Sequence, residues 1–235
     1  MQYSGDVNRA RASAPHLAEL IEFLAANTKA EHINVLGYSA GATLVVEGLG
    51  ELRKRHPESN AEALCKQLRV GNVMLAAADL DLQTFVREQL EAITDVAQHV
   101  SLTVSSKDKA LSWASMLQGS SRLGRPDVKE LTPQDLEAVA KHKNLHVIDV
   151  SRVKGPHSDK SGIAGHGYWY TNPWVSSDVL TTLIWQLPPE QRGLVPVPDK
   201  WRWTFPPDYP QRVRAVVSEE MRRLGSERRE MTRRE

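Results

Sequence analysis

Apolar residues recur with helical spacing in the first part of the chain. In residues 16–26 they fall at positions 17, 20, 21 and 24, as on one face of a helix. Ser13 and Pro15 stand just before them, where a helix cap and a first helical turn are expected. This pattern predicts a first helix that begins close to residue 13.

Four short apolar runs follow, and each is bounded by polar or turn-forming residues. They cover residues 32–39, 69–80, 99–108 and 144–151, and they are typical of buried strands. Helical segments separate them, one at 42–55 and another at 131–143 that opens with the capping residues Thr132, Pro133 and Asp135. Strands that alternate with helices predict an α/β fold, with a mostly parallel sheet flanked by helices.

The pattern changes after residue 151. A long loop rich in glycine and aromatic residues covers 154–174, and a helix is predicted at 177–186. Residues 187–210, which we call the strap, are rich in proline and tryptophan and predict an extended segment. A charged helix ends the chain in a basic tail. We expect a core at 1–186, with the strap and terminal helix (187–235) packed on the same domain.

Composition narrows the functions that this fold can have. A chain of 235 residues can bury a sizeable core, and its net charge of +1 gives no reason to expect a nucleic-acid partner. The single cysteine, Cys65, excludes an internal disulfide framework and a cysteine-rich zinc site. No apolar run approaches the ~20 residues of a membrane span, and the polar start does not resemble a signal peptide. As written the chain is expected in the cytoplasm, and a further upstream segment would leave its localisation open.

One turn carries candidate chemistry. The sequence Gly37-Tyr38-Ser39-Ala40-Gly41 lies between a predicted strand and a predicted helix. A nucleophile elbow has this arrangement, with small residues two positions on either side of an exposed serine because the strand and helix pass close together there. We interpret Ser39 as a nucleophile and the Ala40 N–H as an oxyanion donor. The alternative is a structural turn that happens to contain serine.

A serine nucleophile needs a base and an acid later in the chain. Asp108 follows a predicted strand and is the preferred acid, although it can also cap the next helix. Asp79 and Asp81 end the preceding strand and compete for the role, one of them as a helix cap.

Two histidines lie in the aromatic loop where the base is expected. His166, between Gly165 and Gly167, is preferred to His157. His157, Asp159 and His166 can also be interpreted as metal ligands, but they lack a third firm ligand or a helical spacing. The metal interpretation is therefore weak, and no metal is expected.

With these residues assembled, the chain resembles the α/β-hydrolase superfamily, and more narrowly the bacterial alpha/beta hydrolases grouped as domain of unknown function 900. The resemblance covers residues 3 to about 180 and rests on INVLGYSAG, VMLAAADLDLQTF, VSSKDKALSWASMLQGSSRLG, VIDVS and GHGYWYTNPWVSSD. It implies the triad Ser39, Asp108 and His166, hydrolysis of a small-molecule ester or related acyl substrate, and no cofactor. Tyr38 stands where the family usually has histidine.

Aromatic residues around these motifs are candidate walls of a substrate pocket. Tyr38, Tyr168 and Trp169 are the main ones, with Tyr170 and Trp174 beside them. Packing in the core or against the strap is the alternative interpretation.

The segment before Ser39 departs from the pattern that the resemblance implies. Only 38 residues precede it, and they contain no His-Gly loop and too few residues for the early strands. The fold is therefore expected to be partial, with the elbow strand as an exposed sheet edge that can pair with another chain. A non-catalytic module that associates through this edge is the alternative to an esterase. We expect self-association or marginal stability, and slow ester hydrolysis.

Overall fold

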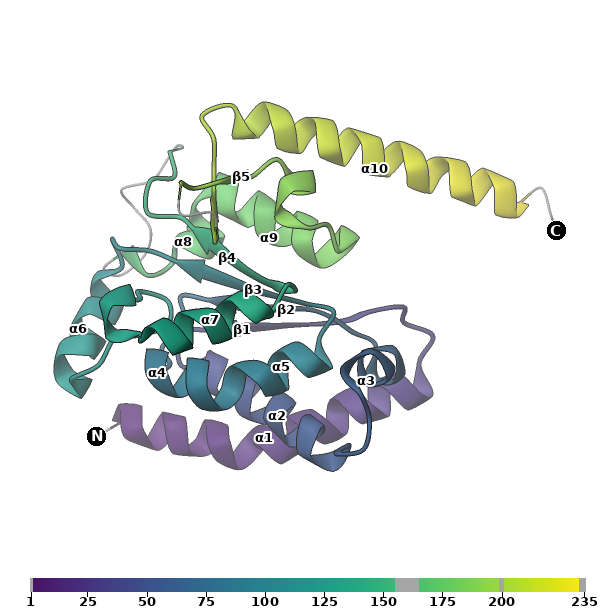
Figure 1. The fold of residues 1–235 in the computed structure, drawn as a ribbon. Coiled ribbons are helices and arrows are strands. Elements are labelled where there is room, and N and C mark those ends of the chain that lie inside the picture. The colour runs from purple at the N-terminus through teal and green to yellow at the C-terminus, as the bar shows by residue number, and fades with distance from the viewer. Residues whose placement is uncertain (1, 155–164, 199–200, 233–235) are drawn as a thin grey trace.

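A six-stranded sheet forms the centre of the computed structural model, which describes residues 2–154, 165–198 and 201–232 (Figure 1). Its strands are β1 (Ile33–Tyr38), β2 (Val70–Ala76), β3 (His99–Val104), β4 (Leu145–Asp149), β5 (Val195–Pro196) and β6 (Arg202–Thr204). Their order is β1-β2-β3-β4-β6-β5, and every neighbouring pair is parallel except β5 with β6. The predicted α/β class and all four predicted strands are confirmed.

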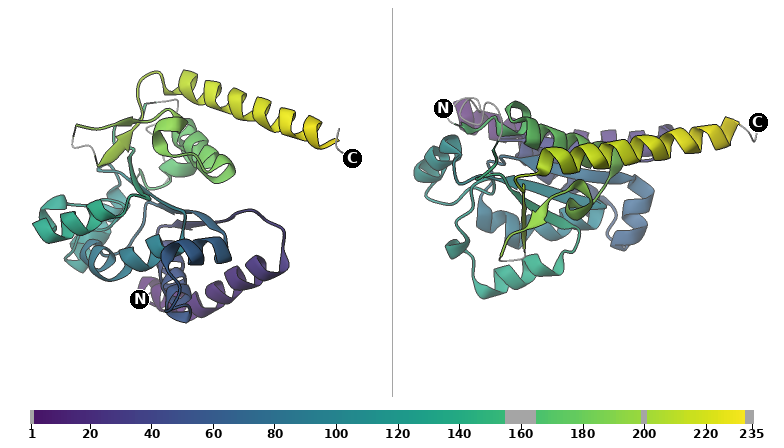
Figure 2. Two further views of the ribbon diagram at one scale, coloured as in Figure 1. Left: turned by 45° about the vertical axis from the view of Figure 1, so that its right-hand side comes forward. Right: turned by 90° about the horizontal axis from the view of Figure 1, so that it is seen from above.

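Helices cover both faces of this sheet, as Figures 1 and 2 show. On one face lie α1 (Gln2–Asn27), α2 (Gly41–Arg55), α3 (Ala61–Leu68), α4 (Leu82–Thr84), α5 (Leu90–Val96) and α7 (Pro133–Lys141). On the other lie α8 (Tyr168–Thr171), α9 (Pro173–Trp185) and α10 (Tyr209–Thr232), while α6 (Lys109–Gln118) lies at one end of the sheet. A π-helical turn at Phe85–Gln89 joins α4 to α5, and 3-10 turns lie at Val128–Glu130 and Pro189–Arg192.

Two apolar clusters form the core, one on each face. The larger joins α1, α2, α3 and α5 to the sheet, and the smaller joins α8, α9 and the start of α10 to it. Every residue of β2 is buried, as expected of a parallel strand covered on both faces.

The first helix differs from its prediction. α1 begins at Gln2 and carries Pro15 in its interior, so Ser13 does not cap it. Its buried residues Ala14, Ala18 and Ile21 pack toward α2, and Leu17 lies against Gly48. Tertiary packing therefore extends a helix through a proline that local signals would place at its start.

The strap also differs from its prediction, because it extends the sheet. β6 pairs in parallel with β4, where Arg202 Nη1 lies 2.7 Å from Asp149 Oδ2 and Thr204 Oγ1 donates to the Asp149 carbonyl at 3.0 Å. The outer edge of β4 is thereby covered. α10 continues beyond the sheet and projects from the molecule (Figure 2).

At the opposite edge, β1 is the terminal strand. Within the described part of the chain it pairs with β2 alone, so the predicted sheet edge is present. No helix among the described residues is long and apolar enough to cross a membrane.

Two histidines on neighbouring strands make stability depend on pH. The rings of His99 and His146 lie 5.5 Å apart, and burial, then His99 and Arg192, lower the pKa of His146 from 6.5 to about 4. An unfolded chain takes up a proton below about pH 6.5, whereas the folded one resists it until about pH 4. Stability is therefore fully present above the unfolded pKa and is lost as the pH falls through this window.

We expect the free energy of unfolding to fall by up to about 3 kcal/mol as the pH is lowered through this window, because His146 contributes about 1.4 kcal/mol per unit of pKa shift. Urea unfolding at pH 7.5, 6 and 4.5 measures it. His146→Leu is expected to flatten this part of the profile, and a profile as steep as that of the parent protein would contradict the assignment.

Candidate active site

Ser39 occupies a strained turn between β1 and α2. Its φ of 53° lies in the left-handed region that side-chain-bearing residues rarely adopt. The turn is fixed to the end of β2 and to the loop after it, because Ser39 N donates to the Ala76 carbonyl at 3.0 Å and Asp79 N donates to the Ser39 carbonyl at 3.2 Å. The local geometry is that of a nucleophile elbow.

The two glycines of the elbow have different surroundings. A Cβ on Gly37 would lie 2.9 Å from Ala42 Cα and 3.0 Å from Val45 Cγ2, so the strand passes close to α2 there. A Cβ on Gly41 would meet nothing within 4 Å. The close-approach explanation therefore holds for Gly37 and is wrong for Gly41.

These surroundings predict opposite effects of two matched substitutions. Gly37→Ala should destabilise the fold by about 1–3 kcal/mol, because the backbone of α2 must move. Gly41→Ala lies in the first turn of a helix with open space around it, and we expect unchanged or slightly higher stability. Urea unfolding of both variants measures the difference, and equal losses would contradict the steric argument.

Asp108, His166 and Ser39 are joined by two successive hydrogen-bond contacts. His166 Nδ1 is 2.7 Å from Asp108 Oδ2, and His166 Nε2 is 2.7 Å from Ser39 Oγ. Asp108 is fully buried, while the His166 side chain is 14% exposed. A carboxylate only accepts hydrogen bonds, so Nδ1 carries the proton and Nε2 is free to accept from the Ser39 hydroxyl.

Local backbone geometry supports both partners. Asp108 is the N-cap of α6, and its Oδ1 accepts the Leu111 N–H at 3.0 Å. The cap and the histidine contact therefore use different oxygens of one carboxylate. Gly165, just before His166, has a φ of 74°, which fits the expectation that glycine permits an unusual backbone there.

The competing acids have other partners. Asp81 caps α4 by accepting the Thr84 N–H at 2.7 Å, and Asp79 Oδ1 lies 2.5 Å from Arg122 Nε. The sequence prediction that one of the two caps a helix is confirmed for Asp81. His157 and Asp159 lie outside the described residues, among which no group of three candidate metal ligands is found.

Aromatic rings border the histidine. The Tyr38 ring centroid lies 5.1 Å from that of His166 and 5.6 Å from that of Trp169, while Tyr170 lies edge-on to both aromatic rings. Burial raises the pKa of Tyr38 to about 12, with further contributions from Tyr170 and Asp108. The Tyr38 hydroxyl therefore stays neutral beside the site at physiological pH.

Tyr168 is placed differently from the other predicted pocket walls. It is 5% exposed, and its hydroxyl donates to the Thr103 carbonyl at 3.1 Å. Burial raises its pKa. This position corresponds to the core-packing alternative, whereas Tyr38 and Trp169 are only partly buried against the same core cluster, and the Tyr38 ring lies beside His166.

Ala40 stands at the N-cap of α2. Its N–H is among the first donors of the helix, which have no intrahelical partner. The positive end of the helix dipole lies at the same place and favours negative charge.

Ion pairs between distant residues were not predicted from the sequence. Asp79 and Arg122, which form an ion pair, are 43 positions apart in the chain and both are buried. Nothing in the sequence pattern links two such residues, so only the fold reveals them.

A mostly parallel sheet, an elbow after one strand, and acidic and histidine side chains after later strands define the class of α/β hydrolases. A model of the family described as alpha/beta hydrolase of unknown function (DUF900) matches residues 1–184, and the chain belongs to that family. The resemblance found in the sequence is thereby confirmed. Comparison with curated proteins and with solved structures finds no match.

Proposed function

We propose that this α/β hydrolase is a serine esterase, with Ser39 as the nucleophile, His166 as the base and Asp108 as the residue that orients the imidazole. The observation that carries the proposal is the continuous line of contacts from Asp108 Oδ2 through both nitrogens of His166 to Ser39 Oγ, at 2.7 Å each. Hydrolase activity follows from the family, and the serine mechanism and the ester substrate are the parts proposed here.

The first half of the reaction follows from the protonation states. Nε2 of His166 removes the Ser39 proton as Oγ attacks the ester carbonyl, and the imidazolium that forms is stabilised by the Asp108 carboxylate. The carbonyl oxygen becomes negative and receives a hydrogen bond from the Ala40 N–H. His166 then donates its proton to the departing alkoxide, which leaves an acyl group on Ser39.

The second half repeats these steps with water. His166 removes a proton from a water molecule that attacks the acyl carbonyl, and the proton returns to Ser39 Oγ as the carboxylic acid leaves. Tyr38 and Trp169 are proposed to contact the acyl group, since the Tyr38 ring borders His166 and the Trp169 ring borders Tyr38.

A fluorophosphonate probe tests the proposal, because it phosphonylates an activated serine. We expect a single adduct on Ser39, located by peptide mass spectrometry, and no adduct on Ser39→Ala. His166→Ala is expected to slow labelling strongly while leaving the hydroxyl in place. An adduct on another serine, or equal labelling of Ser39→Ala, would overturn the assignment.

A non-catalytic module that pairs through its sheet edge is the second candidate. The terminal position of β1 favours it, since a strand edge can pair with another chain. A chain that resists the probe and runs as a stable dimer in light scattering would support this function over the esterase.

A further inference from the structure

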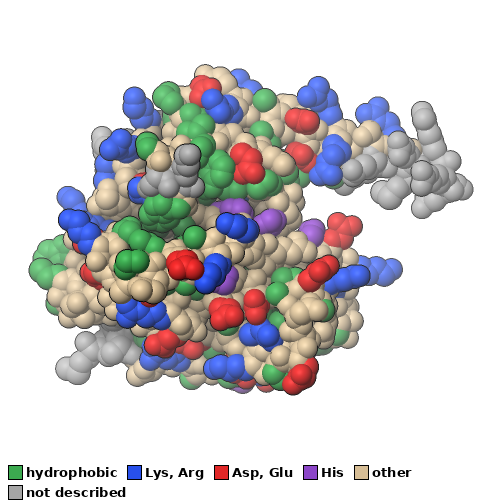
Figure 3. All heavy atoms as spheres, viewed as in Figure 1, with side chains coloured by type: hydrophobic (Ala, Val, Ile, Leu, Met, Phe, Trp, Pro, Cys, Tyr) green, Lys and Arg blue, Asp and Glu red, His purple; other side chains and the backbone are tan. Residues whose placement is uncertain are grey.

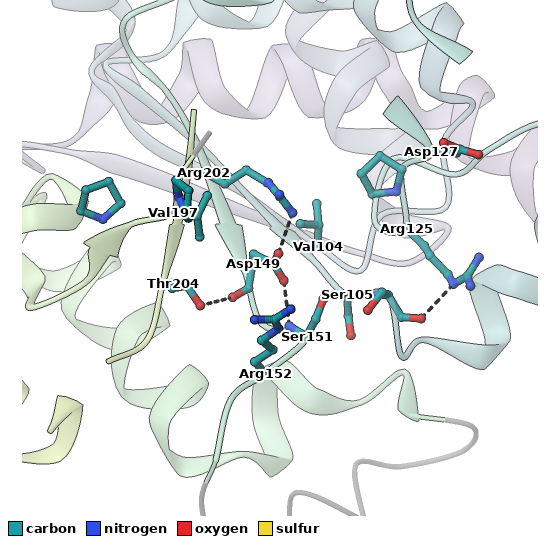
Figure 4. A pocket seen from close by; sticks show the side chains of 14 residues that line it. Val104, Ser105, Arg125, Asp127, Asp149, Ser151, Arg152, Val197, Arg202 and Thr204 are labelled. Atoms are coloured by element: carbon teal, nitrogen blue, oxygen red, sulfur yellow. Dashed lines mark hydrogen bonds and ion pairs between the residues drawn. The ribbon is translucent and has the colours of Figure 1, made fainter. Parts of the chain in front are cut away.

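Two cavities adjoin one another near the carboxyl ends of β3 and β4. The polar cavity, of about 740 Å³, is lined by residues that include Arg125, Arg152, Arg202 and Asp149 (Figure 4). The apolar cavity, of about 300 Å³, lies between β3, β4, the helices from α4 to α5, and α7. Neither is lined by Ser39, Asp108 or His166.

The two cavities share part of their walls. Val104 and Pro126 line both of them, and the adjacent residues Trp201 and Arg202 line the apolar and the polar cavity respectively. The Arg202 guanidinium lies 4.8 Å from the centroid of the Trp201 ring. The two cavities are therefore direct neighbours across the side chains of Val104 and Pro126.

Charge in the polar cavity favours an anion. Its lining contains three arginines and two aspartates. Asp149 is neutralised by Arg202 at 2.7 Å, and the exposed Asp127 caps a 3-10 turn by accepting the Lys129 N–H at 3.1 Å. Figure 4 shows Arg152 and Arg202 on either side of Asp149.

Arg152 is the arginine of the polar cavity that is best placed to pair with a bound anion. Its side chain is exposed, and it forms no ion pair with any other described residue. Arg125 stands on another wall, where its Nε donates to the Ser106 carbonyl at 3.2 Å. A guanidinium fork with unused donors matches the oxygens of a carboxylate or a phosphate.

The apolar cavity has the lining of a hydrocarbon site. All of its wall residues are apolar, from Leu82 and Phe85 on one side to Leu136 and Val139 of α7 on the other. Leu136 is 42% and Trp201 38% exposed, so the cavity opens to the surface, where Figure 3 shows hydrophobic side chains gathered above α7. Its volume is at the lower end of the range for small-molecule pockets.

We propose that this composite cavity binds a single-chain amphiphile. Its anionic oxygen headgroup, a carboxylate or a phosphate, pairs with Arg152 in the polar cavity, and its alkyl chain enters the apolar cavity. The inference does not depend on the proposed esterase activity, because the triad residues are not part of either cavity.

Calorimetric titration of the full chain tests the site. The probes are hexanoate, octanoate and decanoate below their micelle concentrations, with decyl phosphate and decanol for comparison. Affinity is expected to rise by up to about fourfold for each methylene buried and to level off once the apolar cavity is filled. Decanol should bind at least about tenfold more weakly than decanoate, since hydrogen bonds to a charged group are lost. The ratio of decyl phosphate to decanoate affinity identifies the preferred headgroup.

Two substitutions distinguish the contribution of the headgroup to the affinity from that of the alkyl chain. Arg152→Gln should weaken decanoate by about tenfold and leave decanol unchanged, whereas Leu136→Gln should weaken both. Arg222→Gln and Leu180→Gln are matched controls on exposed helix positions elsewhere. Circular dichroism checks that all four variants fold.

Binding must also survive blockage of the serine. Protein labelled with the fluorophosphonate probe, or Ser39→Ala if no label is incorporated, should bind decanoate as the parent protein does. The proposal would be overturned if none of the probes binds, or if decanol and decanoate bind with equal affinity. It would also be overturned if the control variants lose as much affinity as Arg152→Gln and Leu136→Gln.

Discussion

Asp108→Asn is expected to lower the turnover of a short activated ester by about 10⁴-fold, the scale seen when a triad aspartate becomes an amide. The amide cannot hold the imidazole with its proton on Nδ1, so Nε2 no longer accepts the Ser39 proton. The substitution is otherwise conservative, because the Asn oxygen can still accept the Leu111 N–H that caps α6. Loss of activity with unchanged circular dichroism and thermal midpoint would therefore report on catalysis.

Asp81→Asn is the matched control. Asp81 follows β2 as Asp108 follows β3, and it also caps a helix, since its Oδ1 accepts the Thr84 N–H at 2.7 Å. Unlike Asp108, it contacts no histidine among the described residues. We expect its turnover to stay within a few-fold of the parent protein. An active Asp108→Asn beside an inactive, folded Asp81→Asn would reverse the assignment of the acid.

The two contacts of the Asp108 carboxylate illustrate what sequence patterns can and cannot resolve. A residue that follows a strand and precedes a helix is placed at the carboxyl edge of the sheet by the pattern alone. The pattern offers a helix cap and a catalytic acid as alternatives, because both are compatible with that position. The structure shows that a carboxylate with two oxygens makes both contacts, toward Leu111 and toward His166.

Short-range signals predicted the elements well where the local interactions agree with the tertiary packing. The Thr132 capping box is present as predicted, with Asp135 accepting the Thr132 N–H in return. The prediction was wrong for the start of α1, where packing on α2 overrides Pro15. It also missed β5 and β6, since two or three residues give too short an apolar period to recognise.

Contacts between segments far apart in the chain could not be predicted. Arg192 of the strap is buried beside Asp178 of α9, and Arg202 pairs with Asp149 of β4. In the sequence these arginines are ordinary charged residues of a proline-rich segment. Their roles depend on the strap returning to the sheet, for which no local pattern gives a register.

Arg192→Met is expected to reduce the free energy of unfolding by about 3–5 kcal/mol, because it leaves a buried carboxylate without its counter-charge. Arg192 Nε lies 3.0 Å from Asp178 Oδ1, and the two side chains are 1% and 2% exposed. Burial raises the pKa of Asp178, and Arg192 opposes this shift. Arg192 Nη1 also donates to Thr182 Oγ1 and, at 3.3 Å, to the Leu187 carbonyl, so one side chain joins the strap to α9.

Urea unfolding followed by circular dichroism measures the loss, with Arg212→Met as the matched control. Arg212 Nε lies 2.9 Å from Asp208 Oδ2, but the two side chains are 43% and 56% exposed, so we expect a far smaller loss, because exposed ion pairs contribute little to stability. Replacing both partners in Arg192→Met/Asp178→Leu should recover most of the stability, because the penalty arises from the unpaired charge rather than from the loss of attraction. A double variant as unstable as Arg192→Met would show that packing of the arginine stem dominates instead.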